Sequence, residues 1–265
     1  MSESQAVPAS PAPVLESMNI GMILDKAINL YARDFLLLVA ITSIPSVASS
    51  VLNSLMRAAV AGTSLAGSLG VFVMYLLSTV LHGIAGGAMA IVVSSRYLGR
   101  HVTFGVAYAT AFRRAGPIVG AMLLSTLLIL LGSMGLIVPG IILALSYTLV
   151  APVIMLEDIK ATGSLKRSRL LMKGYRWQAL LLFLLFIVVL YTAVIPLTLL
   201  AAYLARATAV RPLVTLASTV LPLLASVLLG PFSSVLSVLI YYNQRIRKES
   251  FDLAFLAEAM ALHQA

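Results

Sequence analysis

The sequence predicts an all-α integral membrane protein, with six transmembrane helices and three or four interfacial amphipathic helices on the cytoplasmic side. Composition is the first reason. Hydrophobic residues make up 61% of the 265 residues and charged residues only 10%, against roughly 45–50% and about 25% in soluble domains. The second reason is that apolar runs of about 20 residues, long enough to cross a bilayer, recur between short charged segments.

The chain divides into a tail, a membrane domain and a closing segment. Residues 1–14 are rich in Ser, Ala and Pro, which predicts a disordered cytoplasmic tail. Residues 15–249 hold the apolar runs, and residues 250–265 have the spacing of an amphipathic cytoplasmic helix. The chain contains no cysteine, which excludes disulfides, thiolate metal sites and cysteine nucleophiles.

The six predicted spans are separated by charged or turn-forming segments; they are residues 35–55, 70–95, 117–137, 140–156, 177–204 and 213–241. Pro45 predicts a bend in the first span, and a small loop around Arg57 and Gly67 precedes the second. The string GLIVPG, from Gly135 to Gly140, predicts an uncharged turn between the third and fourth spans.

The basic residues predict the orientation. When the sides are numbered alternately from the N-terminus, fifteen of the 18 Lys and Arg residues and all nine carboxylates fall on the N-terminal side. The other side holds only Arg57, Arg206 and Arg211. Because basic residues accumulate on the cytoplasmic side, both termini are predicted to be cytoplasmic. The net charge of +9 then reflects orientation and contact with anionic headgroups, not nucleic-acid binding.

Three segments that precede the odd-numbered spans combine helical apolar spacing with too much charge to cross a membrane: residues 15–34, 103–115 and 165–176. In the third segment, four basic residues fall within about a quarter-turn of one another; they are Lys166, Arg169, Lys173 and Arg176. The opposite side is apolar, with Leu165, Leu171, Met172 and Tyr175. Such a helix is predicted to lie in the interface with its apolar side toward the lipid.

The order of one interfacial helix followed by two spans occurs three times in this interpretation. Similar short strings end the three interfacial segments, at residues 30–33, 111–114 and 171–173. Either a threefold internal repeat or interfacial chemistry alone accounts for these matches. The three units share one orientation, unlike the inverted repeats of many secondary transporters.

No catalytic, metal or cofactor motif is recognisable. His82, His101 and His263 are scattered without metal-ligand spacing, and there is no Gly-x-Ser-x-Gly turn, P-loop or dinucleotide fingerprint. The protein is therefore expected not to be an enzyme. One enzymatic alternative remains, a lipid-headgroup enzyme acting through Glu157 and Asp158, and it requires both carboxylates to face solvent unpaired.

His82 is the only ionisable residue near the middle of a predicted span. A polar side chain at that depth is costly and often functional. The favoured interpretation is nevertheless a neutral imidazole that is hydrogen-bonded to a neighbouring helix. Likewise, Pro196, Pro222 and Pro231 are interpreted as kinks satisfied by neighbouring helices, although broken helices can also form a transport site.

The candidate contact residues are basic and belong to the N-terminal side. They are expected to contact anionic lipid headgroups or a protein partner, and they are Lys166, Arg167, Arg169, Lys173, Arg176, Arg113, Arg114, Arg245 and Arg247. A basic residue near the surface attracts anionic lipid by roughly 1 kcal/mol, but the same residues can also act only as topology determinants. Glu157 and Asp158 are predicted to form structural ion pairs with this set.

Several strings, in this order, carry a resemblance: ILDKA (23–27), VPG (138–140), ED (157–158), SLKRS (164–168) and YYNQR (241–245). They resemble a bacterial and archaeal family, the one named for the membrane domain of glycerophosphoryl diester phosphodiesterase, with related membrane proteins of unknown function. The resemblance implies the fold, the topology and a bacterial inner (cytoplasmic) membrane. The namesake also has a soluble catalytic domain, whereas 24 residues follow the last span here, so hydrolysis is not implied. Asn243 stands where relatives often have Asp.

The expected function is therefore that of a non-enzymatic polytopic membrane protein that organises lipid or partner proteins through its basic cytoplasmic face. The alternative is a small permease or transporter subunit with a path between the spans near His82 and Pro196. The expected partners are membrane lipids with anionic headgroups, with a protein partner or a homo-oligomer left open, and no nucleic acid.

Overall fold

The computed structural model describes residues 17–59, 65–204 and 211–249, and within these ranges the chain is helical, without a strand. The helices are α1 (Ile20–Arg33), α2 (Phe35–Ala59), α3 (Leu65–Tyr97), α4 (Phe104–Arg113), α5 (Ala115–Gly135), α6 (Ile137–Tyr147), α7 (Val150–Glu157), α8 (Ala161–Met172), α9 (Arg176–Leu204) and α10 (Arg211–Glu249). The predicted tail, residues 1–14, and the predicted C-terminal helix, residues 250–265, lie outside the described residues.

The predicted fold class is confirmed at the level of helices that are long and apolar enough to cross a membrane. Five segments qualify by length and composition: Phe35–Leu55, Gly67–Tyr97, Ala115–Gly135, Ile137–Glu157 and Ser226–Glu249. A sixth is obtained if α8 and the first part of α9, which meet at an angle of 93°, are counted as one bent span.

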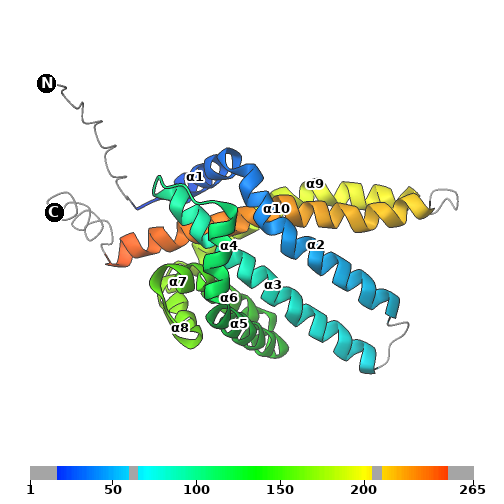
Figure 1. Ribbon diagram of the computed structural model, residues 1–265, viewed down its shortest axis with the longest axis horizontal. Helices are drawn as coiled ribbons and strands as arrows, with labels where there is room; N and C mark the ends of the chain where they lie inside the picture. Colours follow the sequence, from blue (N-terminus) through cyan, green and yellow to red (C-terminus); the bar gives the residue numbers. More distant parts are fainter. Residues whose placement is uncertain (1–16, 60–64, 205–210, 250–265) are drawn as a thin grey trace, which may run out of the picture.

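Helix pairs extend from a common base (Figure 1). The α2–α3 and α9–α10 pairs diverge toward the right of the figure, while α5–α6 lies below the base. We call the distant parts of these pairs the arms; they are residues 47–59, 65–82, 127–141, 183–204 and 211–230. The base comprises α1, α4, α7, α8 and the remaining parts of the long helices.

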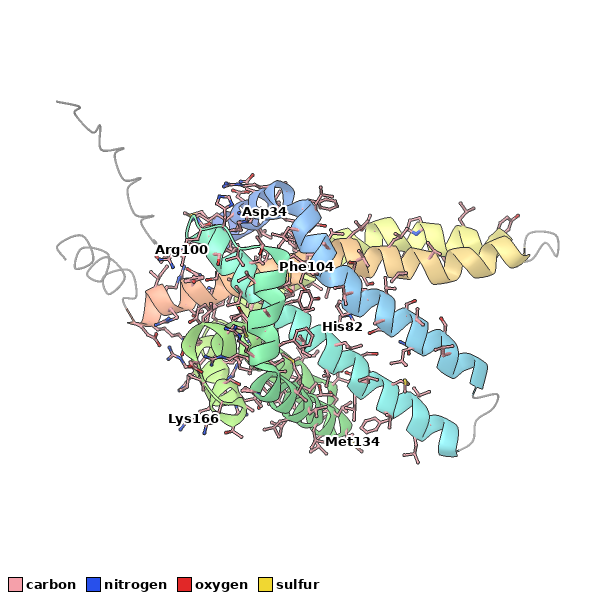
Figure 2. The ribbon with its side chains drawn as sticks, viewed as in Figure 1. Asp34, His82, Arg100, Phe104, Met134 and Lys166 are labelled. Carbon is pink, nitrogen blue, oxygen red and sulfur yellow. The ribbon has the colours of Figure 1, made fainter. Side chains whose placement is uncertain are left out.

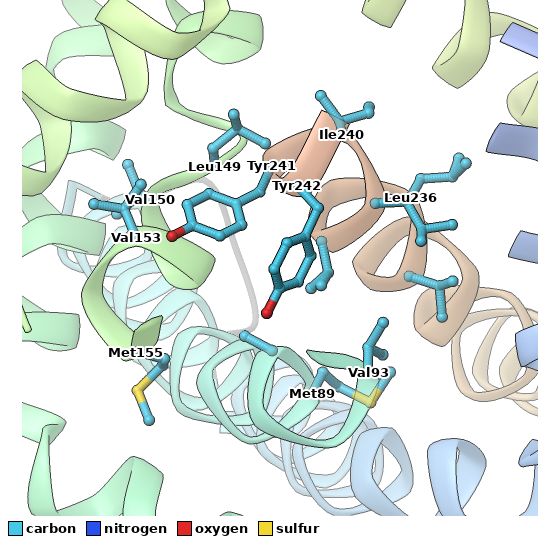
Figure 3. Packing of buried hydrophobic residues seen from close by; sticks show 14 of the residues in the cluster. Met89, Val93, Leu149, Val150, Val153, Met155, Leu236, Ile240, Tyr241 and Tyr242 are labelled. Carbon is cyan, nitrogen blue, oxygen red and sulfur yellow. The ribbon is translucent and has the colours of Figure 1, made fainter. Parts of the chain in front are cut away.

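The apolar core lies in the base. Figure 3 shows Tyr241 and Tyr242 of α10 between Val150 and Val153 of α7 and Met89 of α3, and all five side chains are buried. Glycines allow the helices to approach closely here. A Cβ on Gly87 would lie 2.8 Å from the Cδ1 atom of Ile118 in α5, so the missing side chain lets α3 and α5 touch.

The turn between α5 and α6 differs from the prediction. The GLIVPG string was expected to form the turn as a whole, but α6 already begins at Ile137, and Leu136 alone separates the helices. The turn is tight because Gly132 and Gly140 face each other across it: a Cβ on Gly132 would lie 3.6 Å from the Cα atom of Gly140. A Cβ on Gly140 would lie 3.2 Å from the Cα atom of Ser133.

The predicted loop around Arg57 and Gly67 is also shorter than expected, since α2 extends to Ala59 and α3 starts at Leu65.

The predicted fourth span is interrupted between α6 and α7, at Thr148 and Leu149. A break in a helix leaves backbone groups without partners. Ser168 of α8 satisfies both sides of this break: its hydroxyl donates to the carbonyl oxygen of Ser146 at 2.7 Å and accepts from the backbone N–H of Leu149 at 3.2 Å. The interruption therefore depends on α8.

The predicted third interfacial helix also differs. It was expected to continue to Arg176, but α8 ends at Met172 and α9 begins at Arg176 after a sharp bend. Gly174 permits the bend because its φ is +85°, a left-handed conformation that suits glycine. Arg176 therefore does not share a helical face with Lys166. The apolar side of α8, expected to face lipid, is buried against the protein instead, with Leu171 and Met172 at 1% and 0% exposure.

Two helices that contain a proline are stabilised by hydroxyl groups of neighbouring helices. Proline has no backbone N–H, so Pro45 leaves the carbonyl oxygen of Ile41 without its helical partner. The hydroxyl of Tyr108 in α4 donates to that oxygen at 2.6 Å, and burial raises the pKa of Tyr108 to about 12, which keeps the phenol protonated.

Pro231 in α10 has the same effect on its helix as Pro45 has in α2. It leaves the carbonyl oxygen of Val227 without its helical donor, and the hydroxyl of Thr42 in α2 donates to this oxygen at 3.2 Å. The hydroxyl of Tyr31 in α1 donates to the adjacent carbonyl of Leu228. These hydrogen bonds therefore hold the base together across α1, α2, α4 and α10.

Candidate functional site

The basic candidate residues gather at the base, where nitrogen atoms surround α8 and the C-terminal end of α10 (Figure 2). They come from three regions that are distant in the sequence: the end of α4, the stretch from α8 to the start of α9, and the end of α10. The structure separates them into residues that have internal partners and residues that have none. This division could not be read from the sequence pattern.

Glu157 at the end of α7 is the centre of the first group. Its carboxylate accepts two hydrogen bonds from Arg167 of α8, at 2.7 Å from Nε and 3.1 Å from Nη2. The hydroxyl of Tyr241 in α10 donates to it at 3.0 Å, and Arg245 Nε lies 3.8 Å away. The side chain of Glu157 is only 12% exposed, so the cluster joins α7, α8 and α10 within the base.

Glu249 at the end of α10 completes this cluster. It accepts from Nη2 of Arg167 at 2.8 Å and from Nε of Arg245 at 3.1 Å. Two carboxylates thus face two guanidinium groups, and the charges of the cluster cancel. Arg167 and Arg245 are consequently occupied inside the protein, which reduces what they can offer to an external anion.

Asp158 points to a different partner. It forms an ion pair with Arg114, and its side chain is 76% exposed. Its backbone is left-handed, with φ at 55°, and it ends α7. Both acidic residues therefore have arginine partners, and this geometry does not provide the two unpaired, solvent-facing carboxylates that the lipid-headgroup mechanism requires.

Two further arginines of the candidate set are also partnered. Arg169 donates to the hydroxyl of Tyr147 at 2.6 Å and lies over the ring of that residue, 5.7 Å from its centroid. Arg247 donates to the carbonyl oxygen of Met18 at 2.7 Å. The side-chain oxygen of Asn243 accepts from the backbone N–H of Met18 at 2.8 Å, so this asparagine ties the start of α1 to α10.

Sequence reasoning missed the role of Lys248. Its ammonium group lies at the C-terminal end of α8 and donates to the carbonyl oxygens of Leu170, Leu171 and Lys173, at 2.9, 2.8 and 2.7 Å. The last carbonyl groups of a helix lack intrahelical donors and attract cations. A lysine on one helix thus caps another, an arrangement for which the sequence holds no local signal.

In four candidate residues the charged group of the side chain has no polar partner among the described residues: Lys166, Lys173, Arg113 and Arg176. The first three are exposed, whereas Arg176 is partly buried. Apolar side chains stand exposed near them, including Trp177 at 73% and Phe112 at 60% exposure. These four cations, unlike the partnered arginines, are available to an external anion.

His82 lies on the exposed surface of α3, so the prediction that a neighbouring helix binds its imidazole is wrong. Its Nδ1 atom is 2.8 Å from the carbonyl oxygen of Ser78, one turn earlier in the same helix. Pro196 is also exposed. In the described part of the chain, no group of three or more His, Cys, Asp or Glu side chains is arranged to hold a metal ion.

Two hollows accompany these residues. A groove of about 210 Å³ runs between α6 and the start of α9, where Arg176 lines it. A smaller cavity of about 130 Å³ lies among α3, α7 and α10, and hydroxyl groups of Thr148, Ser233 and Ser237 line it.

No family model, curated protein or solved structure matches the chain.

Proposed function

We propose that this chain is a non-enzymatic membrane protein that binds anionic lipid headgroups at its basic end and so organises lipid around the bundle. One observation carries the proposal: the charged groups of Lys166, Lys173, Arg113 and Arg176 have no polar partner among the described residues and adjoin exposed apolar surface. Neighbouring arginines, in contrast, are neutralised by Glu157 and Glu249. Unpaired cations beside an apolar surface are suited to a phospholipid, which presents an anion above acyl chains.

The proposal includes the predicted orientation. Both termini lie in the cytoplasm, the six spans cross a bacterial inner membrane, and the basic end faces anionic headgroups of the inner leaflet. Helices α1, α4 and α8 lie at the interface, with exposed apolar residues such as Ile28, Val106 and Leu170 directed to the lipid. The resemblance to the membrane domain of glycerophosphoryl diester phosphodiesterase is compatible with this arrangement and remains part of the proposal.

A threefold internal repeat is also proposed. The order of one short helix and two long apolar segments occurs three times, with α1, α4 and α8 as the short helices and the interrupted α6–α7 segment as one long element. Grafting α8 in place of α4 tests it by retention of folded protein. Complete loss of folding, while a scrambled α4 of equal composition is tolerated, would argue against the repeat.

The lipid proposal is tested by removing the exposed unpartnered cations together. We expect that Lys166→Gln, Lys173→Gln and Arg113→Gln combined weaken association with phosphatidylglycerol by about 3 kcal/mol, or roughly 1 kcal/mol per residue. The measurement is the rise in thermal unfolding temperature of the detergent-purified protein when phosphatidylglycerol or phosphatidylcholine is added. Wild type should respond more to phosphatidylglycerol.

A charge-matched control is available at the predicted opposite ends of the spans: Arg57→Gln, Arg206→Gln and Arg211→Gln combined. This variant loses the same charge and should keep the phosphatidylglycerol response. An equal loss in both variants would indicate a general charge effect, and an equal response of wild type to both lipids would contradict the proposal.

The absence of cysteine makes the orientation simple to test. Single-cysteine variants Lys166→Cys and Ser68→Cys should react with a membrane-impermeant maleimide from opposite sides of sealed vesicles. Labelling of both positions from the same side would contradict the predicted topology.

A permease is the second candidate, and the hydroxyl-lined cavity among α3, α7 and α10 is the observation that favours it. Pro152 and the break between α6 and α7 border this cavity, and interrupted helices commonly form substrate sites in transporters. If the cavity is part of a pathway, Ser237→Cys should react with a cationic methanethiosulfonate from the aqueous phase. A cysteine that stays unreactive in native vesicles but reacts after denaturation counts against a pathway.

A further inference from the structure

The groove between α6 and α9 has an apolar floor. Val138, Ile141, Ile142 and Leu145 form one stripe along α6, with the three- and four-residue spacing of a helical face, and Trp177 and Leu180 of α9 form the opposite wall. From Val138 to Leu145 the stripe extends about 10 Å along the helix. Its shape and composition suit a segment of hydrocarbon chain.

One cation stands in this apolar groove. Arg176 lines it at the first position of α9, and no described residue gives its guanidinium a polar partner. Its Nε atom is buried without a hydrogen bond. Arg176 as a whole is partly buried, and a charge that is partly withdrawn from water is stabilised by a counterion, so an anion from outside the chain would complete the site.

The surroundings of Arg176 add to the attraction for an anion. Lys248 stands beside the turn that precedes α9, because its ammonium group donates to the carbonyl oxygen of Lys173 at 2.7 Å. Lys248 is already bound to the carbonyl groups of α8. The N-terminal end of α9 contributes further, because the first N–H groups of a helix lack intrahelical acceptors and favour negative charge.

We propose that this groove is a specific site for one anionic phospholipid, with its phosphate at Arg176 and the upper part of an acyl chain along the α6 stripe. Trp177, exposed beside the guanidinium, has the character of residues at the level of headgroups. A free phosphate ion would leave the apolar floor of the groove uncovered, and a neutral lipid would leave the guanidinium without a counterion. The inference rests on the proposed function and narrows it to one site.

The test uses the single tryptophan of the chain, which is Trp177. The full-length protein is reconstituted in phosphatidylcholine vesicles that contain a small fraction of either phosphatidylglycerol or phosphatidylcholine brominated on the acyl chain near the headgroup. Bromine quenches tryptophan fluorescence at contact. Wild type should be quenched with about fivefold preference for the brominated phosphatidylglycerol, the preference that one cation near a headgroup provides.

Arg176→Gln should reduce this preference to about one. Arg100→Gln, an identical change at an exposed arginine outside the groove, should keep it. Ile141→Phe, which narrows the floor without changing charge, should reduce quenching by both brominated lipids. Inorganic phosphate added at the concentration of the lipid phosphate should not displace the brominated lipid.

Three results would overturn the proposal. The first is equal quenching by the two lipids in wild type, and the second is a preference that survives Arg176→Gln. In the third, Arg100→Gln removes the preference as effectively as Arg176→Gln, which leaves a diffuse basic surface. In the last two cases phosphatidylglycerol still raises the unfolding temperature of the protein, as the proposed function requires. Failure of the site and failure of the function are therefore distinguishable. Displacement by inorganic phosphate would make the site one for free anions.

Discussion

The base and the arms are made of similar apolar helices, yet they differ in how those helices are used. In the base, apolar side chains from α1, α3, α7 and α10 are buried together. In the arms, no apolar side chain among those described is fully buried, and large residues such as Phe72, Met134 and Leu199 are exposed. Because lipid solvates apolar side chains as well as a protein interior does, the arms have no need of packing between pairs.

The same contrast holds for charge. Ion pairs lie in the base, where Glu157 meets Arg167 and Asp34 meets Arg96 at 2.9 Å. The arms hold Arg57 and Arg211 alone among the charged residues of the described ranges. Packing, ion pairs and hydroxyls that bind the carbonyl groups freed by proline therefore all stabilise one end of the molecule. We infer that the base determines the arrangement of the spans.

The largest effect is expected from Glu157→Gln. It leaves Arg167 and Arg245 partly buried without their central carboxylate, and should destabilise the fold by about 3 kcal/mol, the lower end of the range for buried pairs because Arg167 is 25% exposed. Denaturant unfolding in detergent measures it. The neighbouring Asp158→Asn loses the same charge at a 76% exposed side chain and should change stability by less than about 1 kcal/mol. Equal effects would refute the distinction between the two acids.

A pair of leucines on α9 compares the base with the arm directly. Leu182 is fully buried, while Leu184, two residues further on, is 49% exposed. Leu182→Ala should cost about 2–3 kcal/mol through the cavity it leaves, whereas Leu184→Ala should have almost no effect, since lipid or detergent fills the space. The same unfolding measurement decides, and a similar loss at Leu184 would show that the arms are packed.

The Tyr108 contact should contribute about 1–2 kcal/mol to the free energy of unfolding, because Tyr108→Phe leaves the carbonyl oxygen of Ile41 without a donor. The proposed reason for the contact is Pro45, and a double-mutant cycle tests it. In the Pro45→Ala background the restored backbone N–H serves the carbonyl, so Tyr108→Phe should then be nearly neutral. An unchanged cost in that background would mean that the tyrosine acts only by packing.

The smallest effect concerns packing within an arm. Gly140→Ala brings a Cβ against the backbone of Ser133 and should destabilise the α5–α6 pair by about 1 kcal/mol. Gly116→Ala in the base meets no atom within 4 Å and should stabilise α5 by about 0.5 kcal/mol, through lower chain entropy when unfolded. Opposite signs of the shift in unfolding temperature are expected, and matching signs would contradict the close approach at the turn.

Some features were predictable because they depend on residues that are near in the sequence. The apolar runs that predict membrane-crossing helices, and the polar segments between them, need only composition and spacing. The bend at Gly174 and the break after Tyr147 were not predictable in this way. The break depends on Ser168, 22 residues from Ser146, and the α8–α9 angle depends on what α8 packs against.

The candidate site shows the same division. The sequence brings basic residues to one end of the bundle, but it does not tell which of them have partners. Arg167 is neutralised by Glu249, 82 residues away, whereas Lys166 beside it has no partner among the described residues. The partner of His82 was assigned to the wrong helix because helical periodicity cannot show whether a polar residue turns inward or back onto its own turn.

By itself, the sequence determined that this is a helical membrane protein whose charges lie at the ends of apolar helices, since burial in lipid requires long runs without charge. Only the tertiary structure decided that one end is a packed base while the other end spreads into arms. It also decided which cations are left for a ligand. Those outcomes depend on contacts between helices far apart in the chain, and a local pattern of residues carries no information about such contacts.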